Sequence, residues 1–266
     1  RKHIGRLVLG QFIGVPMKSF TIVQNLLTAL VVPFLAAIIG LSSVLGIYIF
    51  WKIQSLWSGN DPSLFIHDID KVPWEQFAIT GIAAGMGIMT WGITLVISSG
   101  LLGGLFRPRL EPGRYPLQSF LTIQWAWSMV FHRIALFFLP FLVPSFVGNT
   151  YYWLSGAKLG KGVQINSAHL NDAGSVTLGD RVVIGGKAII NAHLTEKGEL
   201  VMAPVSIGND ALIGMGSVIQ PGCTIGNGAV VASRAVVPKW TNIPAGEVWA
   251  GIPARCIKLA DGSKPE

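Results

Sequence analysis

Three residues whose side chains can move a proton lie beside interruptions in a six-residue repeat. His169 and Asp172 lie in the first interruption, and His193 lies at the second. An imidazole titrates close to neutral pH, so histidine is well suited to acid–base chemistry. Insertions that leave a repeat structure often build its binding face. The irregular positions are therefore the first candidates for a reactive site.

Each unit of the repeat opens with an aliphatic residue, and a glycine often follows. The aliphatic positions are Leu159, Ile165, Leu178, Ile184, Ile190, Ile207, Ile213, Ile219, Ile225, Val231, Val237 and Ile243. The run from Ile207 to Ile243 is unbroken, whereas the spacings 165–178 and 190–207 exceed two units by one and five residues. This pattern predicts a left-handed parallel β-helix of about four coils over residues 158–260.

The chain as a whole is too apolar for an ordinary soluble protein. Half of all residues are hydrophobic, 12% are charged and the mean hydropathy is +0.54. Residues 19–51 and 76–106 carry no charge, so residues 1–106 are predicted to hold two transmembrane helices. The fold class is α + β. Residues 107–157 contain His132 and Arg133 in an apolar stretch, which favours interfacial or re-entrant helices over a third crossing.

Charges around the two spans indicate their orientation. Basic residues flank both spans, and the connection 52–75 between them carries four acids. The positive-inside rule then predicts an integral protein of the inner (cytoplasmic) membrane, with the β-helix on the cytosolic side. His132 and Arg133 either line a site for a lipid-borne or anionic substrate or snorkel to the headgroups, and we favour snorkelling. The chain starts at Arg1, so we expect a processed protein or a piece of a longer one.

Composition argues against several other classes of protein. The net charge is +7 and the pI about 9.6, but no dense basic stripe exists, so nucleic acid is not an expected partner. The two cysteines, Cys223 and Cys256, are far apart and form no CxxC motif. A disulfide framework or a structural zinc site is therefore not predicted, and no metal is expected.

Three segments carry a resemblance to known families. The hexads, followed by Ile-Pro-Ala-Gly-Glu-Val-Trp-Ala-Gly-Ile-Pro-Ala-Arg at 243–255, resemble the hexapeptide-repeat acyltransferases. Asp172 before Val176-Thr-Leu-Gly-Asp180, and His193 before the excursion loop, resemble the sugar and xenobiotic O-acetyltransferase branch. Residues 107–117, the Trp-rich platform and residues 152–160 resemble the membrane-embedded C-terminal region of nonribosomal-peptide-synthetase-like proteins of the poly-lysine synthetase type.

The resemblance implies a membrane-anchored acyltransferase. Its donor would be acetyl-CoA or another acyl thioester, and its acceptor a hydroxyl or an amine. His193 would be the general base, Asp172 would belong to the catalytic site and orient the acceptor, and Asn166 and His169 would bind the acceptor. The residues expected to bind the donor are Gly214, Gly216, Ser217, Ala232, Lys239, Arg255 and Lys258. Among these, the glycines would offer backbone N–H groups, the small residues would leave room, and the basic residues would meet the CoA phosphates.

Partners and alternatives remain open at this level. The family implies a homotrimer, and the synthetase resemblance allows pairing with a second β-helix module or a larger membrane complex. A carrier-protein thioester is an alternative donor. A non-catalytic scaffold or docking subunit is an alternative function, and a zinc carbonic-anhydrase-like protein is a further one. The last needs three histidine ligands, and no histidine follows His193.

Overall fold

The computed structural model describes residues 19–56, 69–108 and 111–265. The predicted basic segment at the N-terminus, most of the connection between the two spans and Arg109 lie outside the described residues. The chain divides into two compact units, one ending at Ile38 and one beginning at Ile39. Every contact described below lies within the second unit.

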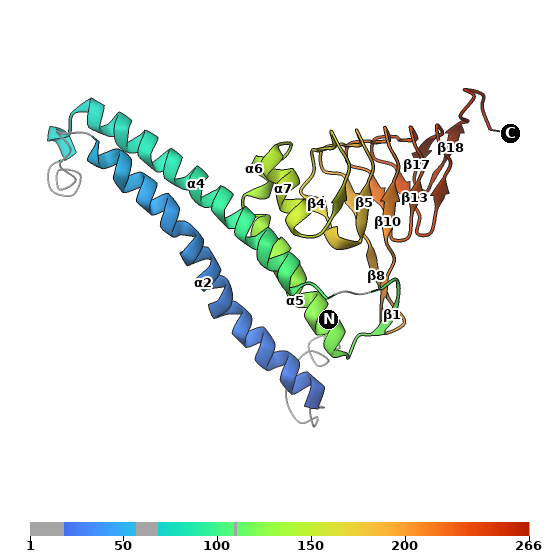
Figure 1. Cartoon of the computed structure of the whole chain (residues 1–266), viewed down its shortest axis with the longest axis horizontal. Coiled ribbons are helices and arrows are strands. Elements are labelled where there is room, and N and C mark those ends of the chain that lie inside the picture. The colour runs from blue at the N-terminus through green and yellow to red at the C-terminus, as the bar shows by residue number, and fades with distance from the viewer. Residues whose placement is uncertain (1–18, 57–68, 109–110, 266) are drawn as a thin grey trace, which may run out of the picture. The chain divides into compact units, whose positions relative to one another are not determined.

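Two long apolar helices come first along the chain: α2 (Ser19–Ser55) and α4 (Trp74–Phe106), with the 3-10 helix η1 (Ile69–Lys71) before α4 (Figure 1). They coincide with the two predicted charge-free spans. In the described parts of the chain, Thr28–Ser55 and Trp74–Phe106 are long and apolar enough to cross a membrane. At about 1.5 Å per residue, each exceeds the hydrocarbon core of roughly 30 Å.

The second half of α2 approaches α4 closely at a pair of glycines. A Cβ added to Gly46 would lie 2.4 Å from the carbonyl oxygen of Gly87. Next to this contact, Trp91 Nε1 donates to Ser42 Oγ at 3.1 Å. Gly81 and Gly85 of α4 have the small-x-x-x-small spacing that favours close helix packing in lipid, but they do not make this contact, because both glycines face open space. The spacing of glycines along α4 does not show which face of the helix contacts α2. In the structure, the contacting face is the one that carries Gly87.

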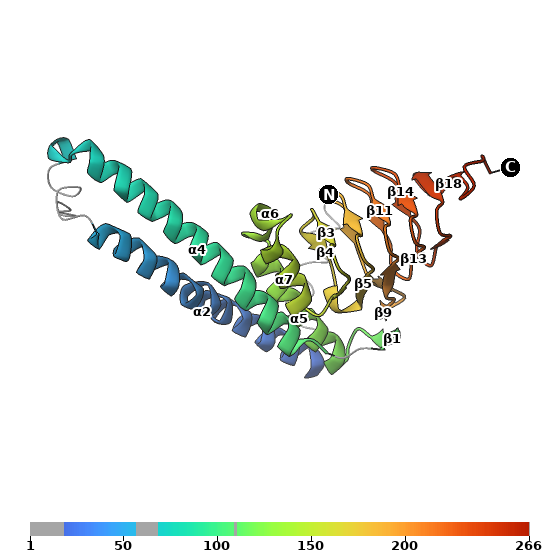
Figure 2. The same ribbon diagram turned by 45° about the horizontal axis from the view of Figure 1, so that its top comes forward.

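Three short helices, α5 (Phe120–Ala135), α6 (Leu139–Leu142) and α7 (Phe146–Leu154), form a platform between α4 and the β-strands (Figures 1 and 2). Ser119 and Ser145 cap α5 and α7 by accepting backbone N–H bonds. At about 1.5 Å per residue, even the 16-residue α5 is shorter than a bilayer core. The location of these helices at the membrane interface stays a prediction.

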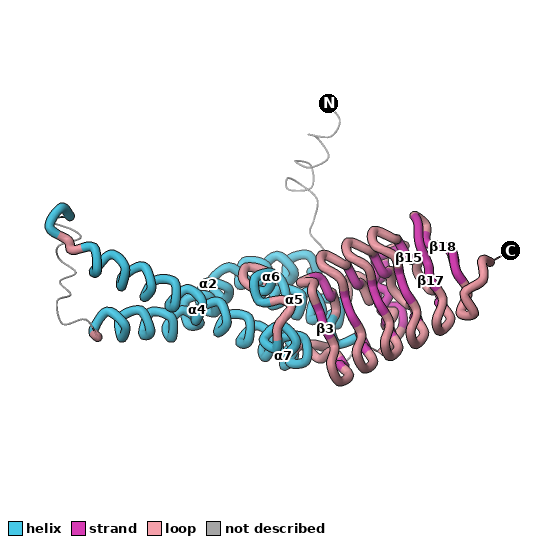
Figure 3. Tube along the Cα trace, turned by 90° about the horizontal axis from the view of Figure 1, so that it is seen from above, coloured by secondary structure: helices cyan, strands magenta, loops and turns pink. Residues whose placement is uncertain are grey.

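Short parallel strands stack into three sheets, whose rungs are visible in Figure 3. Sheet 1 contains β2 (Lys158–Leu159), β5 (Val176–Leu178), β10 (Val205–Ile207), β13 (Thr224–Ile225) and β16 (Asn242–Ile243). Sheet 2 contains β3 (Gln164–Ile165), β6 (Val183–Ile184), β11 (Leu212–Ile213), β14 (Val230–Val231), β17 (Val248–Gly251) and the antiparallel β18 (Ala254–Lys258). Sheet 3 contains β4 (His169–Leu170), β7 (Ile189–Ile190), β12 (Val218–Ile219) and β15 (Val236–Val237). This arrangement is that of the predicted left-handed β-helix.

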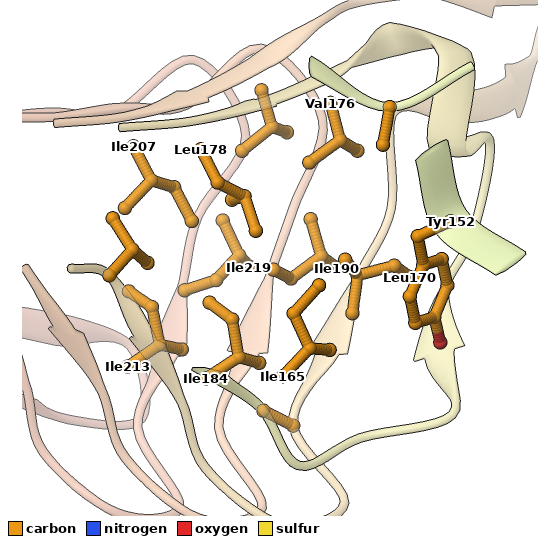
Figure 4. Packing of buried hydrophobic residues seen from close by; sticks show 14 of the residues in the cluster. Tyr152, Ile165, Leu170, Val176, Leu178, Ile184, Ile190, Ile207, Ile213 and Ile219 are labelled. Carbon is orange, nitrogen blue, oxygen red and sulfur yellow. The ribbon is translucent and has the colours of Figure 1, made fainter. Parts of the chain in front are cut away.

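The aliphatic column of the repeat fills the interior of the β-helix (Figure 4). All seven positions from Ile207 to Ile243 are at most 2% exposed. Tyr152 of α7 closes the first end of this core: it is fully buried, and its hydroxyl donates to Ser167 O at 2.9 Å. The platform and the β-helix therefore share one hydrophobic core.

Glycines of the repeat lie where successive coils stack most closely. A Cβ added to any of them would come within 2.4–2.5 Å of an atom of the next coil. Neighbouring strands are only about 4.8 Å apart, so the corner has no room for a side chain. The affected glycines are Gly160, Gly179, Gly185, Gly208, Gly214 and Gly226. The glycine column of the sequence is thus a consequence of the coil spacing.

One hairpin leaves the β-helix, as the longer interruption predicts. It consists of β8 (His193–Glu196) and β9 (Glu199–Met202), and it departs after β7. The strand β1 (Gly113–Pro116), which connects α4 to the platform, pairs antiparallel with β9. The order in this sheet is β1-β9-β8, so the excursion is held by a segment about eighty residues earlier in the chain.

Candidate functional site

Asp172 lies at the corner that connects sheet 3 to sheet 1. It follows β4 and precedes the 3-10 helix η2 (Ala173–Ser175). Its backbone is left-handed, with φ 58° and ψ 49°, a conformation that aspartate tolerates better than most residues. The side chain is 3% exposed. A carboxylate buried to this degree needs hydrogen-bond donors, and two side chains supply them.

His193 lies at the same corner, one coil further on. The register pairs Leu170 with Ile190, and Asn171 Nδ2 donates to Asn191 Oδ1 at 2.7 Å just beyond the strands. This stacking brings His193 Nδ1 into a hydrogen bond with Asp172 Oδ2. If Nδ1 carries the proton and donates a hydrogen bond to the carboxylate, the neutral ring has an unprotonated Nε2 that can accept a proton. A histidine and an aspartate 21 residues apart thus form a dyad.

A third residue, Trp125 of α5, contacts both members of the dyad. Its indole Nε1 donates to Asp172 Oδ1 at 2.8 Å. Its ring meets the His193 imidazole edge to face, with 4.7 Å between the ring centroids. From the sequence, this tryptophan was expected only to belong to the platform. Its partner lies 47 residues away, so no local pattern could have identified the contact.

Ion pairs hold the hairpin that His193 opens. Arg114 of β1 contacts Glu196 at 2.8 Å and Glu199 at 3.1 Å. Lys239 Nζ contacts Glu196 Oε2 at 2.8 Å. The hydrogen bonds from Lys239 and Arg114 hold the pKa of Glu196 below its usual value. The hairpin is therefore attached on one side to the platform connection and on the other to the corner after β15.

A cavity of about 280 Å³ lies between the platform and the first coil, and Asp172 is the member of the dyad that lines it. Asp172, Trp125 and Met202 form part of its wall, and Met202 is the residue paired with His193 across the hairpin. The guanidinium of Arg107 is held against Gly156 and Gly174, where an added Cβ would come within 2.1 and 1.4 Å of it. Four serines contribute hydroxyl groups: Ser99, Ser128, Ser155 and Ser175.

His132 also lines this cavity. It is 9% exposed, and its Nδ1 is hydrogen-bonded to the hydroxyl of Tyr151 at 2.7 Å. Burial lowers the pKa of His132 to about 4, so the ring is neutral at pH 7. The preferred interpretation of snorkelling was therefore wrong for His132, because the packing of α5 against α7 removes it from the surface. Arg133, the next residue, is exposed.

The other predicted site residues are distributed over the β-helix. Asn166 lies at the corner between sheets 2 and 3, 3.7 Å from a Cβ position on Gly186, and His169 lies in β4. Gly214, Gly216 and Ala232 follow strands of sheet 2 in later coils. Ser217 is fully buried and donates to Gly214 O. Arg255 and Lys258 lie in β18, and Lys239 pairs with Glu196.

Among the predicted site residues, the structure brings Asp172 and His193 into a hydrogen bond, and it also joins Ser217 to Gly214. The roles predicted for all of these residues remain predictions. In the ranges that the structure describes, no group of three or more His, Cys, Asp or Glu side chains could hold a metal ion. Cys223 and Cys256 are both free thiols.

Comparison with known proteins matches the repeat and the region before it. Residues 204–239 match the family described as bacterial transferase hexapeptide (six repeats). The chain is 30% identical over 149 residues to a delta-poly-L-ornithine synthetase from Acinetobacter baumannii (strain AB307-0294). That alignment covers 56% of this chain and only 11% of the synthetase, so the chain spans about a tenth of that relative's length.

Solved structures of similar chains include transferases. The acetyltransferase domain of PglB from Neisseria gonorrhoeae FA1090 is 27% identical, with 38% of this chain and 43% of that chain covered and a TM-score of 0.32. A maltose O-acetyltransferase from Clostridium difficile 630 is 19% identical, with 66% and 98% covered and a TM-score of 0.42. With the match at residues 204–239, the predicted resemblance to the hexapeptide-repeat acyltransferases is confirmed, as is the resemblance to a poly-amino-acid synthetase.

Proposed function

We propose that the chain transfers an acyl group from a thioester to a hydroxyl or an amine, with His193 as the general base. The observation that carries this proposal is the hydrogen bond between His193 and the buried Asp172. The carboxylate orients the imidazole and stabilises its protonated form, which leaves Nε2 to work on the acceptor. The match to the transferase hexapeptide repeat supports the same class of reaction.

The proposed reaction is a nucleophilic substitution at the thioester carbonyl. The acceptor oxygen or nitrogen attacks the thioester carbonyl carbon, and His193 Nε2 takes the proton that the acceptor loses. The tetrahedral intermediate then expels the thiolate as its carbon–sulfur bond breaks. The imidazolium returns the proton to the thiolate, so the products are an ester or amide and a free thiol. No oxidant or metal is needed.

The cavity beside Asp172 is the proposed acceptor site. Its serine hydroxyls and the Arg107 guanidinium can hydrogen-bond a small polar acceptor, while Phe131 and Met202 offer apolar contacts. The name of the curated relative, a poly-L-ornithine synthetase, favours an amine-bearing acceptor. We take acetyl-CoA as the first donor to test. A carrier-protein thioester is the alternative that the synthetase relative suggests.

The proposed setting is the membrane surface. Within α2 and α4, large apolar side chains are more than half exposed, including Leu30, Leu41 and Leu101. Burial of such surface in lipid would remove it from water. The cytosolic side, the homotrimer and the pairing with a second β-helix module are parts of this proposal that follow from the charge pattern and the family resemblance.

The test uses the full chain in detergent, with release of CoA thiol from acetyl-CoA measured against L-ornithine, L-lysine and octyl glucoside as acceptors. H193A should lower acceptor-dependent thiol release by about 10²- to 10⁴-fold, the usual contribution of a general base. D172N should lower it as well, because the amide favours the wrong imidazole tautomer. Unchanged thiol release in both variants would leave the non-catalytic scaffold as the better interpretation.

A further inference from the structure

We infer that Trp125 is the positioning residue of the dyad: its indole N–H fixes the Asp172 carboxylate in the orientation that pairs with His193. This inference rests on the proposed function and extends it to the helical platform. Trp125 acts through the carboxylate and not on the reacting atoms. The site is accordingly built from two parts of the chain, α5 of the platform and the first corners of the β-helix.

The two oxygens of Asp172 have separate donors. Oδ2 accepts from His193 Nδ1, and Oδ1 accepts from Trp125 Nε1 at 2.8 Å. The terminal torsion of an aspartate is broad and roughly two-fold, so one hydrogen bond does not fix the carboxylate plane. The second donor removes that freedom. With the side chain only 3% exposed, water has little access to replace the indole N–H.

Trp125 also restricts the imidazole itself. The two rings meet at an interplanar angle of 64° with centroids 4.7 Å apart, an edge-to-face contact. A tryptophan that only filled space would need neither the hydrogen bond to the carboxylate nor contact with the histidine. Here one side chain touches both members of the dyad, which is the arrangement expected of a residue that sets their mutual geometry.

The position of Trp125 is fixed by the same segment that holds His193. Ser119 caps α5 by accepting from Thr122 N, and Thr122 Oγ1 donates to Pro116 O at 2.9 Å. Pro116 is the last residue of β1, which pairs with β9 of the hairpin that His193 opens. Residues 113–125 therefore hold the histidine through β1 and the aspartate through Trp125.

Four single variants of the full detergent-solubilised chain, and the W125F/D172A double variant, test this inference. W125F removes the N–H and part of the ring. Benzothienylalanine at position 125 keeps the bicyclic shape and replaces the N–H with sulfur. D172A removes the acceptor of the hydrogen bond. W153F is the control, because Trp153 lies on the same platform and is 64% exposed.

Thiol release from acetyl-CoA, with the best of the three acceptors, is the first measurement. W125F and the benzothienylalanine variant should lower kcat by about ten- to a hundredfold, as expected when a reacting group is misplaced by a fraction of an ångström. The KM for acetyl-CoA should change less than about twofold. In the D172A background, W125F should have little further effect, because residues that act as a unit are not additive. W153F should resemble the wild type.

The second measurement needs no acceptor. Diethyl pyrocarbonate labelling of His193 at pH 7, followed by peptide mass spectrometry, reports the environment of the imidazole. The benzothienylalanine variant should change the labelling rate in the same direction as D172A, and W153F should not change it. An additive loss in the W125F/D172A double variant, or wild-type labelling in the benzothienylalanine variant, would overturn the inference. If D172A and H193A themselves leave thiol release unchanged, the proposed function fails, and the inference fails with it.

Discussion

Lys239 Nζ lies 2.8 Å from Glu196 Oε2, and Arg114 contacts the other oxygen of the same carboxylate. One acid of the hairpin thus joins three segments: β1, the hairpin itself and the corner after β15. From the sequence, Lys239 was expected to meet the donor phosphates. In the structure Lys239 instead pairs with Glu196, which is 43 residues away and cannot be identified from local patterns.

The ion pairs of Glu196 predict an acid-sensitive hairpin. Because its pKa is lowered in the folded chain, the stabilising contribution is present above the unfolded pKa, roughly 4.3, and is lost as the pH falls through the lower folded value. The protection factors of the β8 and β9 amides, which correct for the pH dependence of intrinsic exchange, should therefore fall below about pH 4. In E196Q these protection factors should be lower at pH 7 and should lose this part of their pH dependence; identical profiles would contradict the prediction.

Burial of His132 predicts a second loss of stability in acid, because this histidine is neutral in the folded chain. Its folded pKa of about 4 lies below the unfolded value, so the unfolded chain binds a proton between about pH 6.5 and pH 4 while the folded chain does not. The free energy of unfolding should decrease as the pH falls from about 6.5 to about 4, by roughly 3 kcal/mol in total at about 1.4 kcal/mol per pKa unit. The measurement is Tm at pH 7 and pH 5. H132Q should show a smaller loss than the wild type, and an equal loss would mean that other groups account for it.

Two adjacent glycines offer a matched test of the coil spacing. A Cβ on Gly185 would lie 2.5 Å from the backbone nitrogen of Met215, and backbone atoms cannot move aside cheaply. A Cβ on Gly186 would come no closer than 3.7 Å to Asn166, an ordinary contact. We expect G185A to cost about 1–3 kcal/mol or more, the range for overpacking, and G186A to cost well under 1 kcal/mol. Urea unfolding of both variants measures the difference, and equal midpoints would contradict the steric account.

The two free thiols should differ in reactivity. Cys223 is fully buried, and burial raises the pKa of its thiol. Cys256 lies in the edge strand β18 and is partly exposed. Iodoacetamide at pH 8 should therefore label Cys256 in the folded chain and Cys223 only after denaturation, as read by intact mass. Two labels on the folded chain would indicate that the end of the β-helix opens.

Periodic features of this fold were predictable from sequence, because each unit repeats the same constraint. Buried aliphatics and corner glycines recur at fixed spacing, so the run from Ile207 to Ile243 was enough to predict the β-helix. The two long helices followed from the absence of charge over residues 19–51 and 76–106. By contrast, Gly81 and Gly85 have the spacing that favours helix packing, yet Gly46 and Gly87 make the contact, since a helical spacing does not specify a face.

The candidate site was predictable only in part. Asp172 and His193 were identified because both lie beside breaks in the repeat and match a family pattern. Trp125, Arg107 and the cavity were not, because they depend on how α4 and α5 pack against the first coil. Contacts between an α-helix and a coil of the β-helix follow neither the helical repeat nor the six-residue repeat, so neither pattern predicts them. These contacts complete the site.

The strand β1 connects the long helix α4 to the hairpin through residues 107–112 and then pairs with β9. If the chain acts as proposed, a shift of α4 relative to the β-helix would reach His193 through the pairing of β1 with β9, because β9 pairs in turn with β8. For a chain anchored through α4 as proposed, the thickness of the bilayer would then be a variable of the proposed reaction, in the same way that pH or donor concentration is.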